Sequence, residues 1–553
     1  MESIFGKFCG TNRNNLNPQE DFISQDRADN SSQNLNFCID NDNKISINFV
    51  GDIWNIENLP NDFIYEKDNI SKAITSGYRE IGAKFFDKIN GSFAIALIDH
   101  MDESLILACD KFGFETIFYE ENNDEIIFSS KLRLITKNKK SINNIDIGAI
   151  CNFLTYRYIP SPQTIFKDIF KLEAGSFLLK KGDKTAQIAT YTKEIPQNKS
   201  VLKAEELQEK FEYLFENAVK KSLLGKSEAS TLLSSGYDST AIAAVLKKMN
   251  IQTKTFSLGY ENWENSEHFK AEKTAQILGT THFNKIIKDD DFPLKHAVAQ
   301  YPEPIADISI LPTNQILSYA SAHTNTIFSG EGADELLAAY NWYYDIFGNE
   351  NFWNKFIANK RNDKIHTYIN HMSMGLFDFQ ELNQLISEDY HKYIPHDSFW
   401  FFDKNLKTKA KVKDFQMLDI MGFMSQLVIK KMSYAAKANS IKLRTPFLEK
   451  ELFEFLISLN PKSYFDGKSH KKVLENYLKN SCKHIIGQKK QGFVPYDSYY
   501  SKFDLYEKII SNSILVENGI FSKSYINQLI IKKETWKLWK IVTLELWLQE
   551  NIY

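Results

Sequence analysis

The stretch from residue 228 to about residue 340 constrains the fold most, because one pattern recurs along it. The pattern is a short apolar run, then a loop of small residues, then a helix-like segment. STLLSSGYDSTAIAAVLKKM shows it first, TKTFSLGY brings a second apolar run, and NTIFSGEGADELLAAY shows the whole pattern again. Buried short strands that alternate with helices indicate a parallel sheet with crossover helices. The sequence therefore predicts an α/β domain here.

The first 135 or so residues follow a different pattern, with short apolar runs separated by turn signals. KISINFVGDIWN, GSFAIALIDH, SLILACDKFG, ETIFYE and EIIFSS are rich in Ile, Phe and Val, which is typical of strands. A connecting region with Pro160, Pro162 and Gly175 follows, and the charged stretch AEELQEKFEYLFENAVKKSLL predicts a helix that opens the second domain. Beyond residue 340 the chain is mostly helix-like and aromatic. We expect two domains, residues 1–195 and 196–553.

Bulk composition excludes several classes of protein. The net charge is −3 and the basic residues are scattered, which argues against nucleic acid as a partner. The sequence contains no run of 18 apolar residues, so no membrane span is predicted, and MESIFGKFCG does not resemble a signal peptide. The five cysteines are widely spaced and contain no CxxC pair, as expected for buried thiols in a reducing compartment. We expect a cytoplasmic protein.

The segment Leu232–Thr240 carries the clearest chemical signal. A strand that ends in small residues before a helix forms an anion site, because backbone N–H groups point into the turn. Asp238 would repel a bare phosphate, so its presence fits a Mg²⁺ that bridges carboxylate and pyrophosphate. The alternative is an ordinary strand–turn–helix with an Asp or Ser cap. The segment lacks the Gly-Lys-Ser/Thr ending of a Walker P-loop.

Two later segments have complementary chemistry. Ser329–Glu335 places two glycines and three acidic residues after an apolar run, where a ligand approaches the carboxyl end of a strand. Three acids so close repel one another unless a cation lies among them, although acids are also common in the first turn of a helix. Gln488–Pro495 brings two lysines beside Gly and Pro, which suits the stabilisation of developing negative charge or an ordinary solvated surface.

Taken in order, these motifs resemble those of the asparagine synthetase family. SSGYDS resembles the SGGxDS pyrophosphate loop of the ATP-pyrophosphatase superfamily, and SGEGADEL resembles the family's SG(E/D)G(A/S)DE segment. EPIAD, MSYA, RTPFL and KKQGFVP resemble further family segments between and after these two. GDIWN, NGSFAIALID, CDKFGFETIFY and YIPSPQTIFKDIFKLEAGSFLL resemble its N-terminal half, so the resemblance covers nearly the whole chain in unbroken order.

The resemblance implies a fold and a reaction. The fold is an N-terminal nucleophile-type β-sandwich flanked by helices, joined to an α/β ATP-pyrophosphatase domain with a helical extension. The reaction is an ATP-dependent amide ligation, in which a carboxylate is adenylated with release of pyrophosphate and an amine then attacks. The implied partners are ATP, Mg²⁺, a small-molecule or peptide carboxylate, and ammonia or a substrate amine; a homodimer is compatible with it.

Carried over position by position, the resemblance also implies roles for individual residues. Pyrophosphate would be held by Ser234, Gly236 and Ser239, and Mg²⁺ by Asp238 and Asp334. The adenosine site would be lined, mainly through backbone atoms, by Leu232, Ser257, Gly259 and Gly330. Lys490 would stabilise charge on the adenylate, Lys431 would face the phosphates, and Glu331 would be the general base beside the amine.

The glutaminase half departs from the family. Ile4-Phe5-Gly6 sets a register that puts Glu2 where the family has its N-terminal nucleophilic cysteine, and a carboxylate cannot replace a thiolate. Exposure of Cys9 by removal of residues 1–8 is the alternative, but it would break the predicted first strand. We therefore expect an inactive glutaminase domain, as in the family's β-lactam synthetases and lasso-peptide cyclases.

The ligase half departs at two acidic positions, which are occupied by Lys430 and Lys442. These changes indicate either an altered, more anionic acceptor or a drift in surface charge. Three functions remain open. The first is an amide ligase that uses ammonia or an intrinsic amine, including a cyclase or a sugar-acid amidating enzyme; the second is a glutamine-dependent amidotransferase; the third is a non-catalytic nucleotide-binding homologue.

Overall fold

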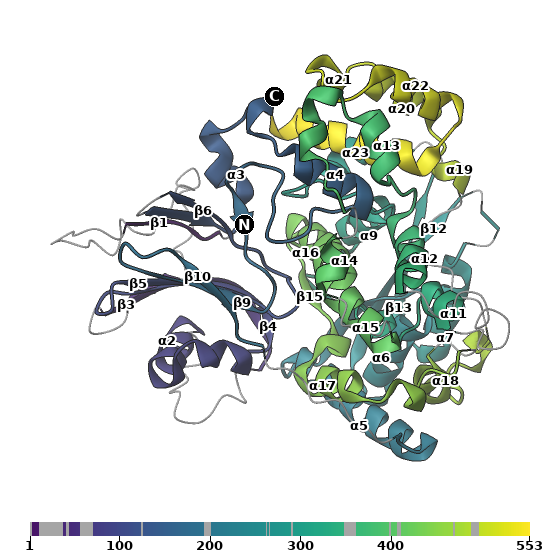
Figure 1. Cartoon of the computed structure of the whole chain (residues 1–553). Coiled ribbons are helices and arrows are strands. Elements are labelled where there is room, and N and C mark those ends of the chain that lie inside the picture. Colours follow the sequence, from purple (N-terminus) through teal and green to yellow (C-terminus); the bar gives the residue numbers. More distant parts are fainter. Residues whose placement is uncertain are drawn as a thin grey trace. The chain divides into compact units, whose positions relative to one another are not determined.

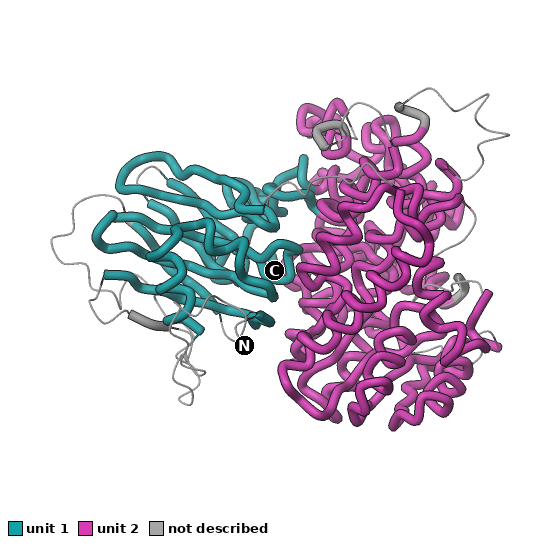
Figure 2. The backbone as a smooth tube through the Cα atoms, turned by 90° about the horizontal axis from the view of Figure 1, so that it is seen from below, with its two compact units in different colours: residues 1–149, 159–194, 551–553 teal, residues 150–158, 195–550 magenta. Residues whose placement is uncertain are grey.

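The chain folds into two compact units, which Figure 2 shows in different colours. The computed structural model describes residues 3–9, 37–39, 44–55, 70–122, 125–192, 201–261, 263–264, 266–288, 291–347, 361–397, 400–405, 411–467, 471–487 and 497–552. Unit 1 comprises residues 1–149, 159–194 and 551–553, and unit 2 comprises residues 150–158 and 195–550. The short segment 150–158 thus belongs with the later part of the chain.

Unit 1 is a sandwich of two antiparallel sheets, which lie face to face in Figure 1. The smaller sheet has the order β1 (Phe5–Cys9), β7 (Glu125–Ser129), β6 (Phe118–Asn122) and β8 (Phe170–Lys171). The larger has the order β10 (Gln187–Thr190), β9 (Ser176–Lys181), β5 (Ser104–Cys109), β4 (Gly91–Asp99), β3 (Ile45–Ile53) and β2 (Phe37–Ile39).

The core of unit 1 explains why its central strands read as continuous apolar runs. One face of β4 and β5 packs in the sandwich interior, where Ile4 and Phe8 of β1 and its approach are also buried. The opposite face packs against α2 (Ile70–Ile81) and the 3₁₀ segment η2 (Gly82–Lys88), through Ile74 and Phe85. Strands buried on both faces have no polar side to alternate with the apolar one.

Unit 2 contains the parallel sheet that the repeated strand–loop–helix pattern predicts, which is confirmed. Its order is β13 (Thr281–Ile287), β12 (Gln252–Tyr260), β11 (Glu228–Leu232), β14 (Thr326–Phe328) and β15 (Lys442–Arg444), and all neighbours are parallel. The connecting helices are α6 (Tyr237–Lys248), α7 (His268–Leu278), α8 (Leu294–Ala299) and α9 (Ile310–Ser321). The chain moves outward from β11 to β13 and then returns past β11 to β14. Right-handed crossovers therefore place α6 and α7 on one face and α9 on the other.

Helices make up most of the remaining described part of unit 2 (Figure 1). The predicted opening helix is α5 (Ala204–Leu223). The later helical elements are α10 (Ala333–Leu336), α11 (Asn341–Phe347), α12 (Arg361–Ser373), α13 (Phe379–Leu385), η5 (Glu388–Tyr393), α14 (Trp400–Asn405), α15 (Val412–Leu418), η6 (Asp419–Val428), α16 (Ile429–Ala438), η7 (Pro446–Leu448), α17 (Lys450–Ser458), η8 (Pro461–Ser463), α18 (Lys472–Leu478), η9 (Lys483–Ile485), α19 (Asp497–Tyr500), α20 (Phe503–Ile510), α21 (Ile514–Glu517), α22 (Lys523–Ile531) and α23 (Thr535–Asn551). Among the described residues, no helix has the length and apolar character that crossing a bilayer requires.

Candidate active site

Two loops meet at the point where the strand order of the parallel sheet reverses. One follows β11 and leads into α6, and the other follows β14 and leads into α10. In open α/β sheets ligands bind outside the carboxyl ends of the strands at such a point. The loops are in close contact, since a Cβ on Gly330 would lie 2.7 Å from the Cβ of Asp238. A glycine is needed at this position because any side chain would push Asp238 aside.

The first loop is held by its own hydroxyl groups. Ser239 Oγ accepts from the Ser234 amide at 3.0 Å, and Ser234 Oγ accepts from the Gly236 amide, also at 3.0 Å. The two hydroxyl oxygens lie 3.0 Å apart. Gly236 is the N-cap of the 12-residue helix α6, with no side-chain cap. Small hydroxyl residues and an uncapped helix N-terminus together form a cradle that suits an oxyanion.

Lys471 brings the two predicted metal-binding carboxylates together. Its Nζ forms an ion pair with Asp238 and lies 2.8 Å from Asp334 Oδ1. The Lys471 side chain is only 4% exposed, and its backbone is in the left-handed region with φ of 56°. A buried cation between two carboxylates shows that this position favours positive charge. The carboxylates fit a Mg²⁺ ion, because that ion takes one or two carboxylates and completes its shell with phosphate oxygens and water.

The structure keeps the other two acids of the second loop apart from this cation. Glu331 accepts a hydrogen bond from the Ser329 hydroxyl, and burial raises its pKa against the effects of that bond and of Lys431. Burial and the neighbouring Asp334 raise the pKa of Glu335 to about 8, while Tyr340 donates to it at 2.7 Å. The acids therefore escape mutual repulsion in three ways: one is paired, one is hydrogen-bonded and one is held largely neutral.

The helix after the second loop is shorter than the sequence pattern indicates. α10 is a single turn, and Ala338 behind it has a φ of 49°. Gln416 from α15 donates its side-chain amide to the carbonyls of Glu335 and Leu336 at 3.1 and 3.0 Å. These carbonyls would otherwise lack partners at the end of a buried helix. A distant residue thus completes the turn that the local sequence alone would continue.

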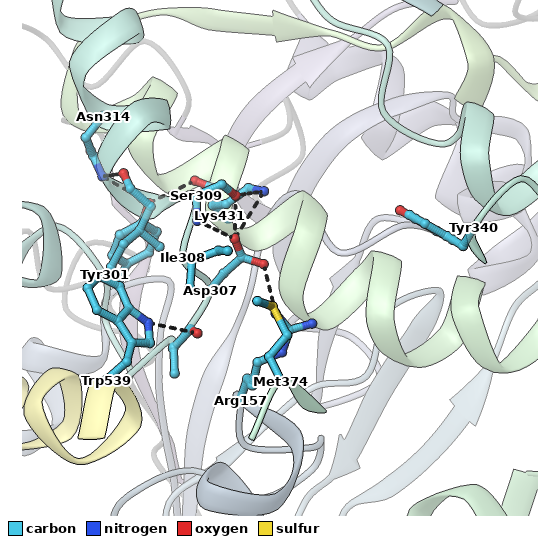
Figure 3. A network of polar contacts seen from close by, with 12 residues as sticks. Arg157, Tyr301, Asp307, Ile308, Ser309, Asn314, Tyr340, Met374, Lys431 and Trp539 are labelled. Atoms are coloured by element: carbon cyan, nitrogen blue, oxygen red, sulfur yellow. Dashed lines mark hydrogen bonds and ion pairs between the residues drawn. The ribbon is translucent and has the colours of Figure 1, made fainter. Parts of the chain in front are cut away.

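A second cationic cluster lies on the α9 and α16 side of the sheet (Figure 3). Lys431 donates to the Ser309 hydroxyl at 2.6 Å and lies 3.7 Å from Asp307 Oδ1. The Arg157 guanidinium lies 3.6 Å from the other oxygen of Asp307. Burial acts to raise the pKa of Asp307, but Lys431, Arg157 and two hydrogen bonds from Ser309 outweigh it and lower the pKa to about 2. Asp307 is therefore ionised and holds both cations.

Arg157 is an unusual member of this cluster. It comes from the segment 150–158, is 4% exposed and has a φ of 71°, a costly backbone conformation for an arginine. Its Nη1 donates to the weakly accepting sulfur of Met374 at 3.2 Å, and its buried Nε has no hydrogen-bond partner among the described residues. Such a strained, poorly satisfied cation is typical of functional sites.

The predicted adenosine-site residues on β12, Ser257 and Gly259, contact other residues of the protein. The Ser257 hydroxyl bonds to His282 and Asn284 of β13, so its side chain is occupied within the sheet. A Cβ on Gly259 would lie 2.3 Å from the His268 ring, which shows that this glycine makes room for a histidine. Leu232 ends β11 beside Phe256, at the start of the first loop. The two β12 residues can serve a nucleotide only through their backbone atoms.

Some residues with a predicted or considered catalytic role lie outside the part of the chain that the structure describes. Lys490 and the rest of 488–496 lie outside the described residues, as does Glu2. The described part of the chain contains no group of three or more His, Cys, Asp or Glu side chains arranged to hold a metal ion.

The two lysines at family acidic positions are described. Lys442 is exposed on the edge strand β15, and Lys430 Nζ lies 5.9 Å from the centroid of the Tyr434 ring.

Sequence reasoning missed two residues of this site. Lys471 stands in the run HKKVLENYL, where it looks like one of several surface lysines. Arg157 stands in the connecting region, which the strand and helix patterns treat as a link between domains. A basic residue directly before an apolar helical run, and one beside a proline-rich turn, were the available signals. Neither indicates what the side chain contacts.

The buried carboxyl of Asp419 provides a test of the electrostatics. Asp419 opens the π-helical segment η6 and is fully buried, with hydrogen bonds from Tyr343, Tyr368 and Trp342. Burial outweighs these bonds and raises its pKa to about 7. A carboxyl whose pKa is raised on folding stabilises the fold below its unfolded pKa near 4, and that contribution is lost as the pH rises to about 7.

Asp419→Asn is therefore expected to flatten the pH dependence of stability between pH 4 and 7. Asparagine keeps the shape and does not ionise, so the variant should lose less stability than the wild type as the pH rises. Urea unfolding midpoints of both proteins at several pH values measure this. Parallel curves for the two proteins would show that Asp419 does not titrate in this range.

Comparison with known proteins agrees with this geometry. The family model described as asparagine synthase matches residues 210–549, and the glutamine amidotransferase domain model matches residues 25–192. The chain is 24% identical over 549 residues to glutamine-hydrolyzing asparagine synthetase 1 of Bacillus subtilis, covering 91% of this chain and 85% of that protein.

Two further relatives match mainly one part of the chain. A putative asparagine synthetase of Mycobacterium tuberculosis is 28% identical over 309 residues, which cover 53% of this chain and 47% of that protein. Putative asparagine synthetase 2 of Methanocaldococcus jannaschii is 28% identical over 305 residues, covering 54% and 59%. The chain thus spans about half the length of these two relatives. Because the asparagine synthase model matches more than half of this chain, the protein belongs to the asparagine synthase family.

Proposed function

We propose that this protein is an ATP-dependent amide-forming ligase that adenylates a carboxylate, releases pyrophosphate and then joins an amine to the activated acyl group. The observation that carries the proposal is the pairing of Asp238 and Asp334 across one cation, beside the Ser234–Ser239 cradle. A cradle for phosphate next to two cation-binding carboxylates is the arrangement that a departing pyrophosphate requires. Membership of the family supports the same reaction.

Each residue has a task in this reaction. Ser234, Gly236 and Ser239 would bind the pyrophosphate oxygens through hydroxyl and amide groups that now bond to one another. Asp238 and Asp334 would hold Mg²⁺, which when bound neutralises phosphate charge. Lys471 would then exchange one carboxylate partner for a phosphate oxygen.

Glu331 would act in the second half of the reaction. When the amine attacks the acyl-adenylate, an amide bond forms, AMP leaves with the bonding electrons and the amine must lose a proton. Burial raises the pKa of Glu331 above its ordinary value, and a raised pKa favours a carboxylate as a general base. The positive charge of Lys431 acts to lower the pKa of Glu331 and so opposes the effect of burial. Lys431 would also face the phosphates. Lys490 would stabilise the adenylate, as the resemblance implies.

Product analysis tests the reaction. Full-length protein is incubated with ATP, Mg²⁺, ammonium and a panel of carboxylic acids, and the nucleotide products are separated. We expect AMP and pyrophosphate in equal amounts, dependent on one class of acid. Formation of ADP and phosphate would contradict adenylation, and an absence of both nucleotide binding and turnover with every acid would favour a non-catalytic homologue.

We also propose that the N-terminal unit does not supply ammonia from glutamine. Glu2 stands where the family has its nucleophilic cysteine. Activation of Cys9 would require removal of residues 1–8, which include Ile4 and Phe8 of the sandwich core, at 0% and 6% exposure. Losing two buried apolar side chains costs about 3 to 6 kcal/mol, so this cleavage would damage the fold around the new terminus.

Ammonium should therefore support turnover and glutamine should not. Cys9→Ser is expected to leave the ammonium-dependent rate unchanged, and neither protein should release glutamate from glutamine. A coupled glutamate assay measures this directly. Glutamate release by the wild type that disappears in Cys9→Ser would instead establish a glutamine-dependent amidotransferase.

A further inference from the structure

A cavity of about 370 Å³ lies at the edge of the unit 2 sheet opposite the candidate active site. Its lining includes the first residues of β11, the start of β12 and β13, and the turn that leads into β14. The volume falls within the range of about 300 to 1,000 Å³ that is typical of small-molecule sites. Nothing in the proposed ligation uses this amino-terminal edge of the sheet.

The lining of this cavity is polar and positively charged. The lining residues include three that carry a positive charge, Lys226, Lys254 and Arg444, and one that carries a negative charge, Glu228. Three cations against one anion give the lining a formal charge of +2. Hydroxyl groups of Ser230 and other Ser and Thr residues add hydrogen-bonding capacity. A concave surface with excess positive charge concentrates anions and disfavours apolar ligands.

The two lysines are also available to a ligand. Among the described residues, Lys254 donates only to the backbone carbonyl of His323, at 3.3 Å, which is a long bond to a neutral group. Within the described part of the chain, the Lys226 ammonium has no hydrogen-bond or ion-pair partner. Arg444 is 3% exposed, so its guanidinium is fixed in the wall and is not a mobile surface group. Lysine and arginine in such positions bind phosphate and carboxylate groups.

We propose that this cavity is a binding site for a small anion that carries phosphate or carboxylate groups. The site is separate from the candidate active site. β11 is five residues long, so its first and last Cα atoms lie about 13 Å apart at about 3.3 Å per residue. The ligand is therefore an effector of the protein and not its reacting substrate.

The fold connects the two sites through short covalent and hydrogen-bonded paths. Phe328 lines the cavity and directly precedes Ser329 of the second loop. Arg444 lines the cavity, and its backbone carbonyl accepts from the Ser329 amide at 2.8 Å. An anion that binds the Arg444 guanidinium would act, through Arg444, on the loop that holds Glu331. Binding at the two sites would then be linked, in either direction.

Calorimetric titration of the full-length protein with inorganic phosphate and, separately, with citrate tests the site and distinguishes the two anion types. We expect saturable binding of at least one probe, weakened at least tenfold in the double variant Lys226→Ala/Lys254→Ala. Both lysines are exposed or half-buried, so the variant should keep the wild-type circular dichroism spectrum and thermal midpoint. Lys508→Ala/Lys523→Ala, which removes two exposed lysines from α20 and α22, is the matched control and should bind normally.

A second variant separates this site from the phosphate cradle. Ser234→Ala/Ser239→Ala should retain the binding that Lys226→Ala/Lys254→Ala loses. The proposal is overturned if neither probe binds at millimolar concentration, or if binding survives the lysine changes and disappears with the serine changes. Either result would leave the proposed ligation untouched, because that reaction is followed by AMP and pyrophosphate formation.

Discussion

Asp238→Asn is expected to reduce ATP-dependent pyrophosphate release by on the order of 100-fold or more, since a ligand for charge-neutralising Mg²⁺ contributes several kcal/mol to such a transition state. The amide keeps the shape of the carboxylate but not its charge. The fold should survive, because Lys471 still has Asp334 at 2.8 Å. Initial rates of pyrophosphate release at saturating ATP measure the effect, and unfolding midpoints confirm that the variant is folded.

The control for this change is Asp504→Asn. Asp504 lies in the first turn of α20 and is exposed, so it also tests the loss of one surface negative charge. It should keep the wild-type rate. Raising the Mg²⁺ concentration should partly restore Asp238→Asn if the defect is metal affinity. A folded Asp238→Asn protein with wild-type pyrophosphate release would refute the metal assignment.

Lys471→Met is expected to lower the stability of the unliganded protein by about 3 kcal/mol, the cost of removing one partner from a buried ion pair. Methionine fills similar space, so the main change is electrostatic: Asp238 and Asp334 would face each other without a cation. Turnover should fall as well, because a cation beside the phosphates is lost. Urea unfolding in EDTA measures the first effect, and the product assay measures the second.

Two comparisons make this experiment specific. Mg²⁺ with ATP should raise the unfolding midpoint of Lys471→Met more than that of the wild type, because a new cation relieves the repulsion. The double variant Lys471→Met/Asp334→Asn should be more stable than Lys471→Met, since one of the two charges is gone. If Lys471→Met is as stable as the wild type in EDTA, Lys471 does not hold the carboxylates together in solution.

Local chemistry made much of the site predictable. Ser234, Gly236, Asp238 and Ser239 lie within six residues, so a strand–loop–helix pattern is sufficient to place them around one turn. The second loop could be added because carboxyl ends of parallel strands share one edge of a sheet. The strand pattern placed each loop at the end of a strand, and the structure shows that Asp238 and Gly330, 92 residues apart, are in contact.

Other parts of the site depend on contacts that no periodicity encodes. The acids of the second loop look equivalent in the sequence, but Lys471, Ser329 and Tyr340 give them three different environments. The resemblance assigns Gly259 to the adenosine site, and the structure shows that a Cβ on this residue would meet the His268 ring.

The sequence by itself determined the parallel sheet, the strand-rich N-terminal domain and the two loops at the strand ends, because these follow from short-range patterns of apolar and small residues. Only the tertiary structure decided which cations pair with the carboxylates of the site. Lys471 and Arg157 reach Asp238 and Asp307 across 233 and 150 residues of chain. A long charged side chain is stable on a surface or in a buried pair, and the surrounding packing alone distinguishes the two.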